Sequence, residues 1–219
     1  MLCLYALLGD RPSALPNGIR ILACGQLYAA VADVDHEPAV EEGALRGHER
    51  IVRALANHVD AILPVRFGSV MPDEESLSRL LQRREMEWRP ALELVAGREQ
   101  MTLRLFAEPS TKPEELTEED GGMGPGSRYL AKKLRERGRP EVAKVLEEIR
   151  PLLAPLVKAE RIQYQDKPPL LASVYHLIER GEGAHYIQAV DGADSGASSV
   201  RVAVSGPWPP YAFGRWEDA

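Results

Sequence analysis

Several metal-binding side chains cluster near residue 35. Four potential ligands fall within five residues: Asp33, Asp35, His36 and Glu37. Calcium loops need oxygen ligands at a defined spacing, which this segment lacks, and a zinc site needs a further His or Cys cluster, which the sequence does not provide. His48 and His58 are ten residues apart on one expected helix, too far apart to share a metal ion. We therefore expect a solvated loop and no metal site.

A glycine-rich segment, Gly121 to Gly126, leads into an expected helix, as phosphate-binding loops do. However, it follows acidic residues instead of a strand, and it lacks the Lys-Ser/Thr ending of such loops. We expect a flexible joint at this position. Ser69, Ser173 and Ser205 lie outside any nucleophile-elbow pattern, so no catalytic triad is indicated. No cofactor is expected. An enzyme acting through His48 or the cluster from Asp33 to Glu37 is an alternative that would need a metal ion or a second catalytic partner, and the sequence shows neither.

Composition excludes further classes of function. Asp and Glu number 33 against 27 Lys and Arg, and the resulting net charge of −6 argues against binding to nucleic acid through phosphates. No apolar run approaches the roughly 18 residues that a membrane helix requires. Met1 to Leu8 reads as a strand instead of a signal peptide. Cys3 and Cys24 fit buried free thiols in a reducing cytoplasm, with a bridge between adjacent strands as the alternative.

The first hundred residues alternate between strand and helix periodicity, which indicates a mixed α/β domain over residues 1–97. The expected strands are Leu2 to Leu8, Ile19 to Ala23, Gln26 to Val34 and Ala61 to Val65. One amphipathic helix is expected from Glu41 to Asp60, with Leu45 and His48 on its apolar stripe. A second is expected to start at Pro72, as its first helical residue, and to continue to about Val95.

A second domain is expected over residues 98–219. Arg98 to Phe106 alternates as a half-buried strand, and Glu108 to Gly126 has linker composition. A helix with an apolar stripe that includes Leu152 follows. Glu160 to Gln165, Leu170 to Ile178 and Ser199 to Ser205 read as strands, and Gly181 to Val190 as a helix. The order strand, helix, strand, strand, helix, strand suggests a ferredoxin-like unit. The predicted class is therefore α+β with two domains.

The C-terminal segment Ser205 to Phe213 combines prolines with large aromatic side chains. Its prolines and aromatics are Pro207, Trp208, Pro209, Pro210, Tyr211 and Phe213. Proline fixes φ and removes a backbone donor, so we expect an extended segment that does not continue a central strand. Rigid aromatics suit a docking surface for another protein. The alternative is a strap whose aromatics close the fold.

Three segments together resemble the GvpF/GvpL family of gas vesicle accessory proteins. They are Leu63-Pro64-Val65-Arg66-Phe67-Gly68, the segment Gly122-Met123-Gly124-Pro125-Gly126-Ser127-Arg128-Tyr129-Leu130, and the tail from Ser205 to Phe213. The resemblance covers nearly the whole chain, and three such segments in this order are specific. A short acidic loop before Gly121 and a polar end after Phe213 are the departures, and the resemblance does not separate GvpF from GvpL.

The resemblance implies a non-enzymatic role in gas vesicle assembly in the cytoplasm. It implies binding to the hydrophobic shell protein GvpA and contacts with other accessory proteins, and a second domain of modified ferredoxin-like fold. We expect Arg66, Phe67 and the tail aromatics to contribute to docking, because an exposed apolar shell subunit needs aromatics or open sheet edges in its partner. Arg66 has an alternative role, pairing with a carboxylate at the domain junction. A small-molecule-binding regulatory protein is the competing function.

Overall fold

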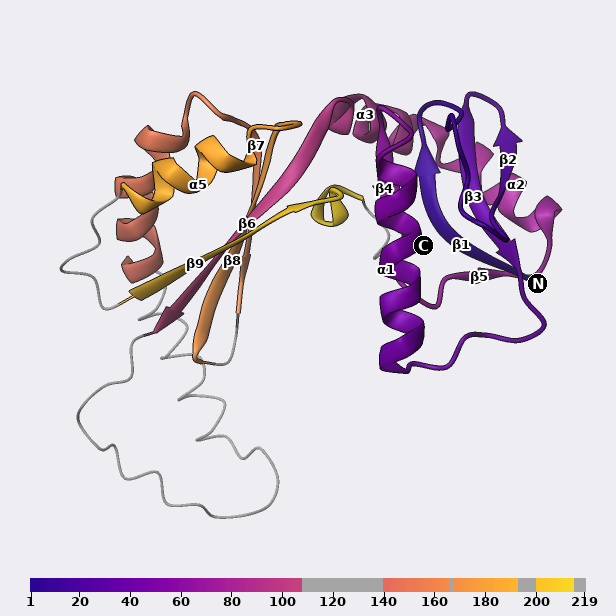
Figure 1. Cartoon of the computed structure of the whole chain (residues 1–219), viewed down its shortest axis with the longest axis horizontal. Coiled ribbons are helices and arrows are strands. Elements are labelled where there is room, and N and C mark those ends of the chain that lie inside the picture. Colours follow the sequence, from indigo (N-terminus) through magenta and orange to yellow (C-terminus); the bar gives the residue numbers. More distant parts are fainter. Residues whose placement is uncertain (108–139, 166–167, 193–199, 215–219) are drawn as a thin grey trace, which may run out of the picture. The chain divides into compact units, whose positions relative to one another are not determined.

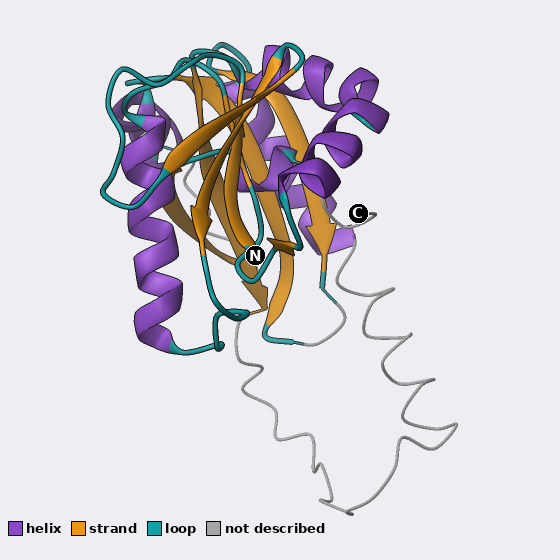
Figure 2. Cartoon of the chain, turned by 90° about the vertical axis from the view of Figure 1, so that its right-hand side faces the viewer, coloured by secondary structure: helices purple, strands orange, loops and turns teal. Residues whose placement is uncertain are grey.

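A computed structural model describes residues 1–107, 140–165, 168–192 and 200–214. Two compact units emerge, one formed by Met1–Gln100 with the segment from Pro207, the other by Met101–Gly206. Each unit combines helices with an antiparallel sheet (Figures 1 and 2), so the predicted α+β class is confirmed. The sequence placed the tail with the second domain. In the structure its described residues from Pro207 pack with the first unit, where Tyr211 contacts an apolar core.

A mixed-length sheet forms the centre of the first unit, with strand order β2-β3-β1-β4 and with β5 also paired to β1. The strands are β1 (Leu2–Leu8), β2 (Arg20–Cys24), β3 (Leu27–Asp33), β4 (Ile62–Pro64) and β5 (Val70–Met71). The pairings of β1 with β3, β4 and β5 are antiparallel. Gly25, with φ of 64°, supplies the left-handed residue of the tight turn between β2 and β3.

Helices cover this sheet, which is why β1 is buried at nearly every residue. They are α1 (Glu42–Ala56), α2 (Glu74–Arg83) and α3 (Glu85–Val95). Val52 and Leu55 of α1 pack on Ala6 and Leu8 of β1. Figure 1 shows α1 and α2 on opposite sides of the sheet. The expected stripe of α1 is correct at His48, Val52 and Leu55, but Leu45 is 43% exposed. The helix ends at Ala56 instead of Asp60.

The helix predicted from Pro72 to Val95 is instead two helices that meet at Arg84. The backbone of Arg84 leaves the helical region, with φ of −111° and ψ of 12°, and its guanidinium bonds Glu87 in the first turn of α3. The spacing of apolar residues continues unbroken across Arg84, so the sequence carried no signal for the break. Helix α2 begins at Glu74, not at Pro72, because Asp73 is its N-cap residue and its carboxylate accepts from the amide of Ser76 at 2.7 Å.

The second unit has strand order β7-β8-β6-β9. Its elements are β6 (Arg98–Ala107), helical residues 140–153, β7 (Val157–Tyr164), β8 (Leu170–Glu179), α5 (Gly183–Asp191) and β9 (Val200–Trp208). Alternate residues of β6, Met101, Leu103 and Leu105, pack with both helices in one core. The described elements follow the order expected from the sequence, and the modified ferredoxin-like description of this unit stays a prediction.

Two expectations for this half of the chain need correction. Leu152, placed on the apolar stripe, is 45% exposed. The last strand does not stop at Ser205 but continues through Gly206 and Pro207 to Trp208. Because β9 is at the edge of the sheet, it can contain a proline, which a central strand rarely tolerates. The predicted linker Glu108 to Gly126 and the start of the following helix lie outside the described residues.

Cys3 and Cys24 are both buried free thiols. Their strands are separated by β3, so the alternative of a bridge between neighbouring strands does not hold. In the part of the chain that the structure describes, no helix is both long and apolar enough to cross a membrane.

Candidate functional site

The tail is a strap on the first unit over much of its length. After β9, Pro209 and Pro210 are buried, and Tyr211–Phe213 form a short 3-10 helix instead of the extended segment that was expected. Phe213 is only 1% exposed, and the amide of Ala212 donates to Oε1 of Gln100 at 2.8 Å. The alternative of a strap therefore describes Pro209, Pro210 and Phe213, whose surfaces are taken up by the fold.

Trp208 and Tyr211 keep part of their surface exposed and lie against α1. The guanidinium of Arg53 is 4.4 Å from the ring centre of Trp208, and Arg53 also pairs with Glu49 one turn earlier at 3.0 Å. Tyr211 packs on the core beneath α1, where burial, with a contribution from the negative charge of Glu49, raises the pKa of its hydroxyl to about 12. Tyr211 is therefore protonated at neutral pH, and its hydroxyl can donate a hydrogen bond.

The second predicted segment, Arg66-Phe67-Gly68, forms a turn closed by the amide of Ser69 donating to the carbonyl of Arg66 at 3.2 Å. Gly68 has φ of 83°, a conformation that other residues rarely adopt. Arg66 is exposed, and no described carboxylate lies within 4.0 Å of its guanidinium. The alternative pairing of Arg66 with a carboxylate at the domain junction stays a prediction, and the exposure of Arg66 leaves its charge available to another molecule.

His48 connects this turn to α1. Its Nε2 lies 3.0 Å from the carbonyl of Val65, and since a carbonyl only accepts, Nε2 carries the proton and donates. The ring stacks on Tyr5 at 4.9 Å and meets the edge of Phe67 at 5.6 Å. Burial lowers the pKa of His48, although the bond to Val65 opposes this, so the ring is neutral. The predicted packing role of His48 is correct.

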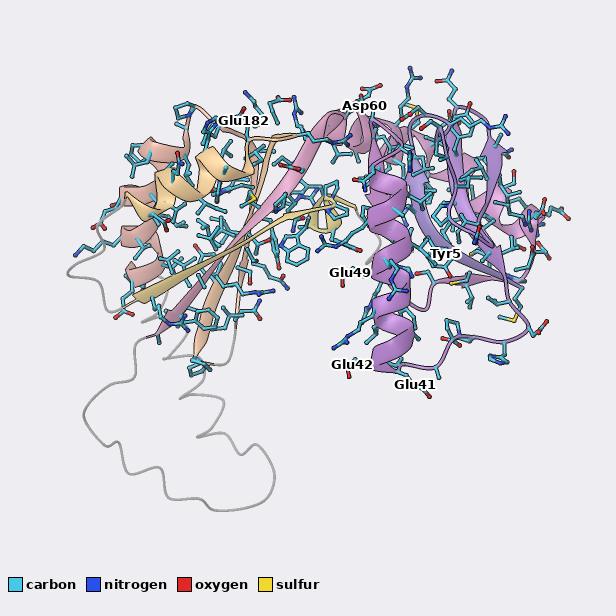
Figure 3. The ribbon with its side chains drawn as sticks, in the orientation of Figure 1. Tyr5, Glu41, Glu42, Glu49, Asp60 and Glu182 are labelled. Atoms are coloured by element: carbon cyan, nitrogen blue, oxygen red, sulfur yellow. The ribbon has the colours of Figure 1, made fainter. Side chains whose placement is uncertain are left out.

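Helix α1 therefore contacts both predicted segments. His48 contacts Phe67, and Arg53, five residues later, contacts Trp208. Figure 3 shows Glu49 projecting from the same helix. We call Arg53, Arg66, Phe67, Trp208 and Tyr211 the α1 surface. It combines aromatic rings that are partly exposed with two guanidinium groups.

The acidic cluster near residue 35 does not converge on a centre. Asp33 pairs with Arg20 at 2.9 Å, which lowers the pKa of its carboxyl, and Nδ1 of His36 contacts the carbonyl of Glu37. No group of three or more His, Cys, Asp or Glu side chains among the described residues is placed to hold a metal ion. The glycine-rich segment from Gly121 lies outside the described residues.

A buried polar network in the second unit was missed by sequence reasoning. The hydroxyl of Tyr186 is 2.6 Å from Nδ1 of His176, Nε2 of His176 is 2.9 Å from Glu160, and Glu160 accepts from Arg150 at 2.8 Å. Burial lowers the pKa of His176, so the neutral ring donates to Glu160 and accepts from Tyr186. His176 and Tyr186 are almost fully buried, so the network holds α5 to the sheet.

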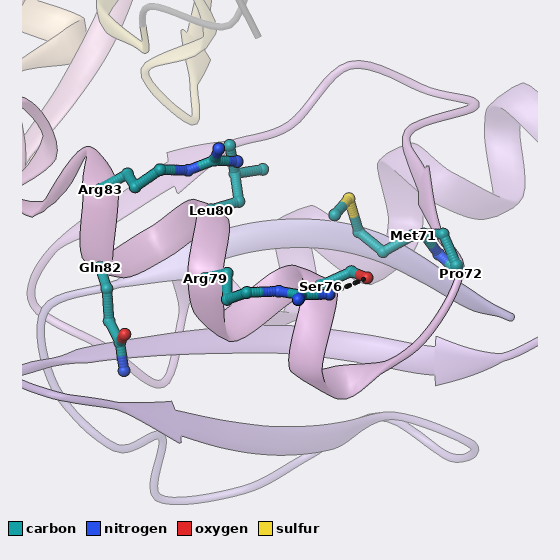
Figure 4. Close-up of a pocket in the computed structure, with 7 residues that line it drawn as sticks. All are labelled: Met71, Pro72, Ser76, Arg79, Leu80, Gln82 and Arg83. Carbon is teal, nitrogen blue, oxygen red and sulfur yellow. Dashed lines mark hydrogen bonds between the residues drawn. The ribbon is translucent and has the colours of Figure 1, made fainter.

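A shallow groove of about 820 Å³ runs along α2 (Figure 4). It is lined by Met71, Pro72, Ser76, Arg79, Leu80, Gln82 and Arg83. Arg79 reaches back to Glu75 of its own helix at 3.6 Å and to the hydroxyl of Ser76 at 3.3 Å. The groove holds no combination of nucleophile, base and orienting group, so its geometry indicates no reaction.

Comparison with known proteins identifies the family. The chain matches the family described as gas vesicle synthesis protein GvpL/GvpF over residues 4–215. It is 25% identical to gas vesicle protein F of Streptomyces sp. (strain CB03234) over 211 residues, which cover 90% of this chain and 88% of that protein. Gas vesicle protein L of the same strain is 26% identical over 227 residues, covering 94% and 84%.

Solved structures share the fold. The crystal structure of GvpF from Microcystis aeruginosa superposes with a TM-score of 0.73 at 15% identity, covering 97% of this chain and 98% of that one. GvpF from Anabaena sp. PCC7120 gives a TM-score of 0.72 at 16% identity, covering 97% and 94%. The similarity to proteins F and L of one strain is nearly equal, so it does not separate these two types. The chain belongs to the gas vesicle GvpL/GvpF family, whose members take part in gas vesicle formation.

Proposed function

We propose that this chain is a non-enzymatic accessory protein that binds the shell protein GvpA and assists the nucleation and assembly of gas vesicles. The α1 surface is the proposed docking surface. The observation that carries the proposal is the convergence of two family-like segments, the Arg66–Gly68 turn and the tail, on one helix of the first unit. In this role the protein works in the cytoplasm and at the vesicle, together with other accessory proteins.

The chemistry of the α1 surface suits a partly apolar partner. Phe67, Trp208 and Tyr211 are each partly exposed and are held by contacts to α1 or to the core beneath it, so little side-chain entropy is lost on binding. Aromatic and Arg side chains carry much of the energy of protein interfaces. A shell subunit with an exposed apolar patch would otherwise associate with its own copies. The α1 surface offers such a patch an alternative partner.

Differences in burial within the tail support Trp208 and Tyr211 as docking candidates. Pro209, Pro210 and Phe213 are buried, so they act by holding the strap, whereas Pro207 is exposed and Trp208 and Tyr211 are half-buried. Removal of the whole tail would therefore change folding and docking together. Single substitutions at Trp208 and Phe67 test docking more cleanly than a truncation.

The test is co-purification of co-expressed GvpA with wild type, Trp208→Ala, Phe67→Ala and a control, Tyr164→Ala. Tyr164 is 41% exposed on β7 of the second unit, so its substitution removes an exposed aromatic ring elsewhere. We expect about tenfold weaker binding, or about 1.4 kcal/mol, for Trp208→Ala and Phe67→Ala, and no change for the control. Thermal unfolding of each variant is measured in parallel.

Two results would count against the proposal. Failure of the wild-type chain to retain GvpA would refute the partner. Retention of GvpA by both α1-surface variants at wild-type level would refute the docking surface. A large loss of stability in Trp208→Ala would show that this ring, too, belongs to the strap, and Phe67→Ala would then decide.

A further inference from the structure

Among the described strands, none pairs with the outer side of β2 in the first sheet. Strand β2 is the terminal strand in the order β2-β3-β1-β4, and it pairs only with β3. Figure 1 shows it at the outer side of the sheet. At the opposite end of the order, β4 is contacted by both α3 and the short 3-10 helix of the tail. Helix α2 also contacts β2, and Arg20 of β2 pairs with Glu74 of α2, but no described strand pairs with the outer side of β2.

The register of the hairpin identifies which backbone groups face outward. Cys24 pairs with Leu27 across a two-residue turn, and such a closing pair exchanges its hydrogen bonds. Because hydrogen-bonded and non-hydrogen-bonded pairs alternate along an antiparallel ladder, Ala23 and Ile21 occupy the non-bonded positions opposite Tyr28 and Ala30. Their amides and carbonyls therefore point away from β3. No described residue accepts from or donates to these groups.

The edge lacks three devices that often protect a free strand. It contains no proline and no lysine, and its ladder to β3 has no bulge. Its only charged side chain, Arg20, is already engaged by Asp33 at 2.9 Å and by Glu74 at 2.6 Å. Ile21 and Leu22 are partly exposed and Ala23 is exposed. An uncharged, apolar strand is the partner that matches an edge whose single charge is neutralised.

We propose that β2 binds an extended, uncharged apolar segment of a partner protein, which adds as a further strand beside Ile21 and Ala23. Backbone hydrogen bonds supply affinity in this mode, and side chains on alternate positions supply specificity. The inference rests on the proposed function in one respect, namely that the partner is the shell protein. It names a second contact, formed by the backbone of β2, that is distinct from the α1 surface.

Two substitutions at one position block strand addition by different means. Ala23→Pro removes an outward amide, and an edge strand tolerates proline where the amide faces solvent. Ala23→Lys keeps the amide but adds the charge that natural edges use against pairing. The control Val40→Lys adds the same charge at a residue that is 81% exposed in the segment before α1. If Ala23→Pro does not fold, Ala23→Lys carries the test.

The experiment is co-purification of GvpA with these three variants and with wild type. We expect retention by wild type and Val40→Lys and about tenfold weaker binding by both Ala23 variants. Retention of GvpA by both folded Ala23 variants at wild-type level would overturn the edge inference and leave the proposed function intact. Sedimentation of wild type alone is the companion measurement, because a dimer that Ala23→Lys abolishes would assign the edge to a second copy and overturn the proposed partner strand.

Failure of wild type to retain GvpA would refute the proposed function. A separate probe then tests whether β2 accepts an added strand. A short synthetic peptide of alternating valine and threonine is added to the full chain, and amide hydrogen exchange is measured. Slower exchange at Ile21 and Ala23 in the presence of the peptide supports the inference. Unchanged exchange at both amides overturns it.

Discussion

At the scale of the residue, burial determines the protonation and the hydrogen bonds of two histidines. His48 and His176 are 6% and 2% exposed, and each donates from Nε2 to an oxygen. They differ at the other ring nitrogen. Nδ1 of His176 accepts from Tyr186, whereas Nδ1 of His48 finds no partner among the described residues. Protonation would place a second N–H on each ring, and only His176 has an oxygen ready to receive it.

These histidines predict a loss of stability in mild acid. Burial lowers the pKa of both below the ordinary value of 6.5, so the unfolded chain binds protons there before the folded protein does. Their contribution to the free energy of unfolding is complete above pH 6.5 and is lost as the pH falls through the lowered folded-state values. Urea unfolding at about pH 7.5 and about pH 5 measures this loss.

The carboxyl group of Glu160 contributes little to the loss of stability between about pH 7.5 and about pH 5. Burial raises the pKa of Glu160, but hydrogen bonds from Arg150 and His176 outweigh it, so the pKa lies below 4.5 and this contribution is lost only at more acidic pH. His48→Gln and His176→Gln, each keeping a nitrogen donor, should flatten the dependence on pH. An equally steep dependence in both variants would contradict the assignment.

At the scale of the element, glycines show which backbone positions are required. Gly97 has φ of 66° directly before β6, and its amide donates to the carbonyl of Asp60. Gly47 lies inside α1, and a Cβ added there would meet nothing within 4 Å. A helix-interior glycine costs about 1 kcal/mol relative to alanine, so nothing in the structure of the first unit explains Gly47.

The same substitution at these two glycines should have opposite effects. Gly47→Ala should raise the free energy of unfolding by about 0.5–1 kcal/mol, through lower backbone entropy in the unfolded chain. Gly97→Ala should lower it by about 1–2 kcal/mol, because alanine is strained in the left-handed region. Chemical denaturation measures both. A loss of stability in Gly47→Ala would show that the open space over α1 is not available to a side chain.

Elements with a local signal were predicted well from the sequence, and those decided by distant contacts were not. The apolar run from Leu2 to Leu8 and the glycine turn at Gly25 gave strands close to the observed bounds. The break at Arg84 and the continuation of β9 past Pro207 depend on side-chain bonds and on the position of a strand within its sheet. Neither property is visible in the spacing of apolar residues.

The candidate site residues also divide into those with a local signal in the sequence and those that depend on distant contacts. Phe67, Trp208 and Tyr211 were identified from their residue types, but their meeting on α1 depends on tertiary contacts. The network of Tyr186, His176 and Glu160 joins a helix and two strands, and its members are separated by ten and sixteen residues. No motif spacing marks such a network, so only the folded chain reveals it.

At the scale of the whole molecule, the chain leaves the first unit within β6 and returns to it within β9. The tail residues from Pro207 thus stabilise a unit that is formed mainly by the first hundred residues. Phe213 is buried. Tyr211 packs against the apolar core beneath α1, which includes Ile62 and is also contacted by Tyr5. Loss of the tail should therefore weaken the first unit, although the tail follows the second unit in sequence.

Truncation after Gly206 tests whether the tail stabilises the first unit. Loss of a buried Phe side chain alone costs about 3–5 kcal/mol, so amide protection should fall sharply in β1 and β4. Amides of β8, whose buried residues Ala172 and Val174 belong to the core of the second unit, should keep their protection. Hydrogen exchange of the full and truncated chains gives both readings, and Phe213→Ala serves as a milder version. An equal loss of protection in β1 and β8 would show that the two units unfold together, and that the tail stabilises the whole molecule instead of the first unit.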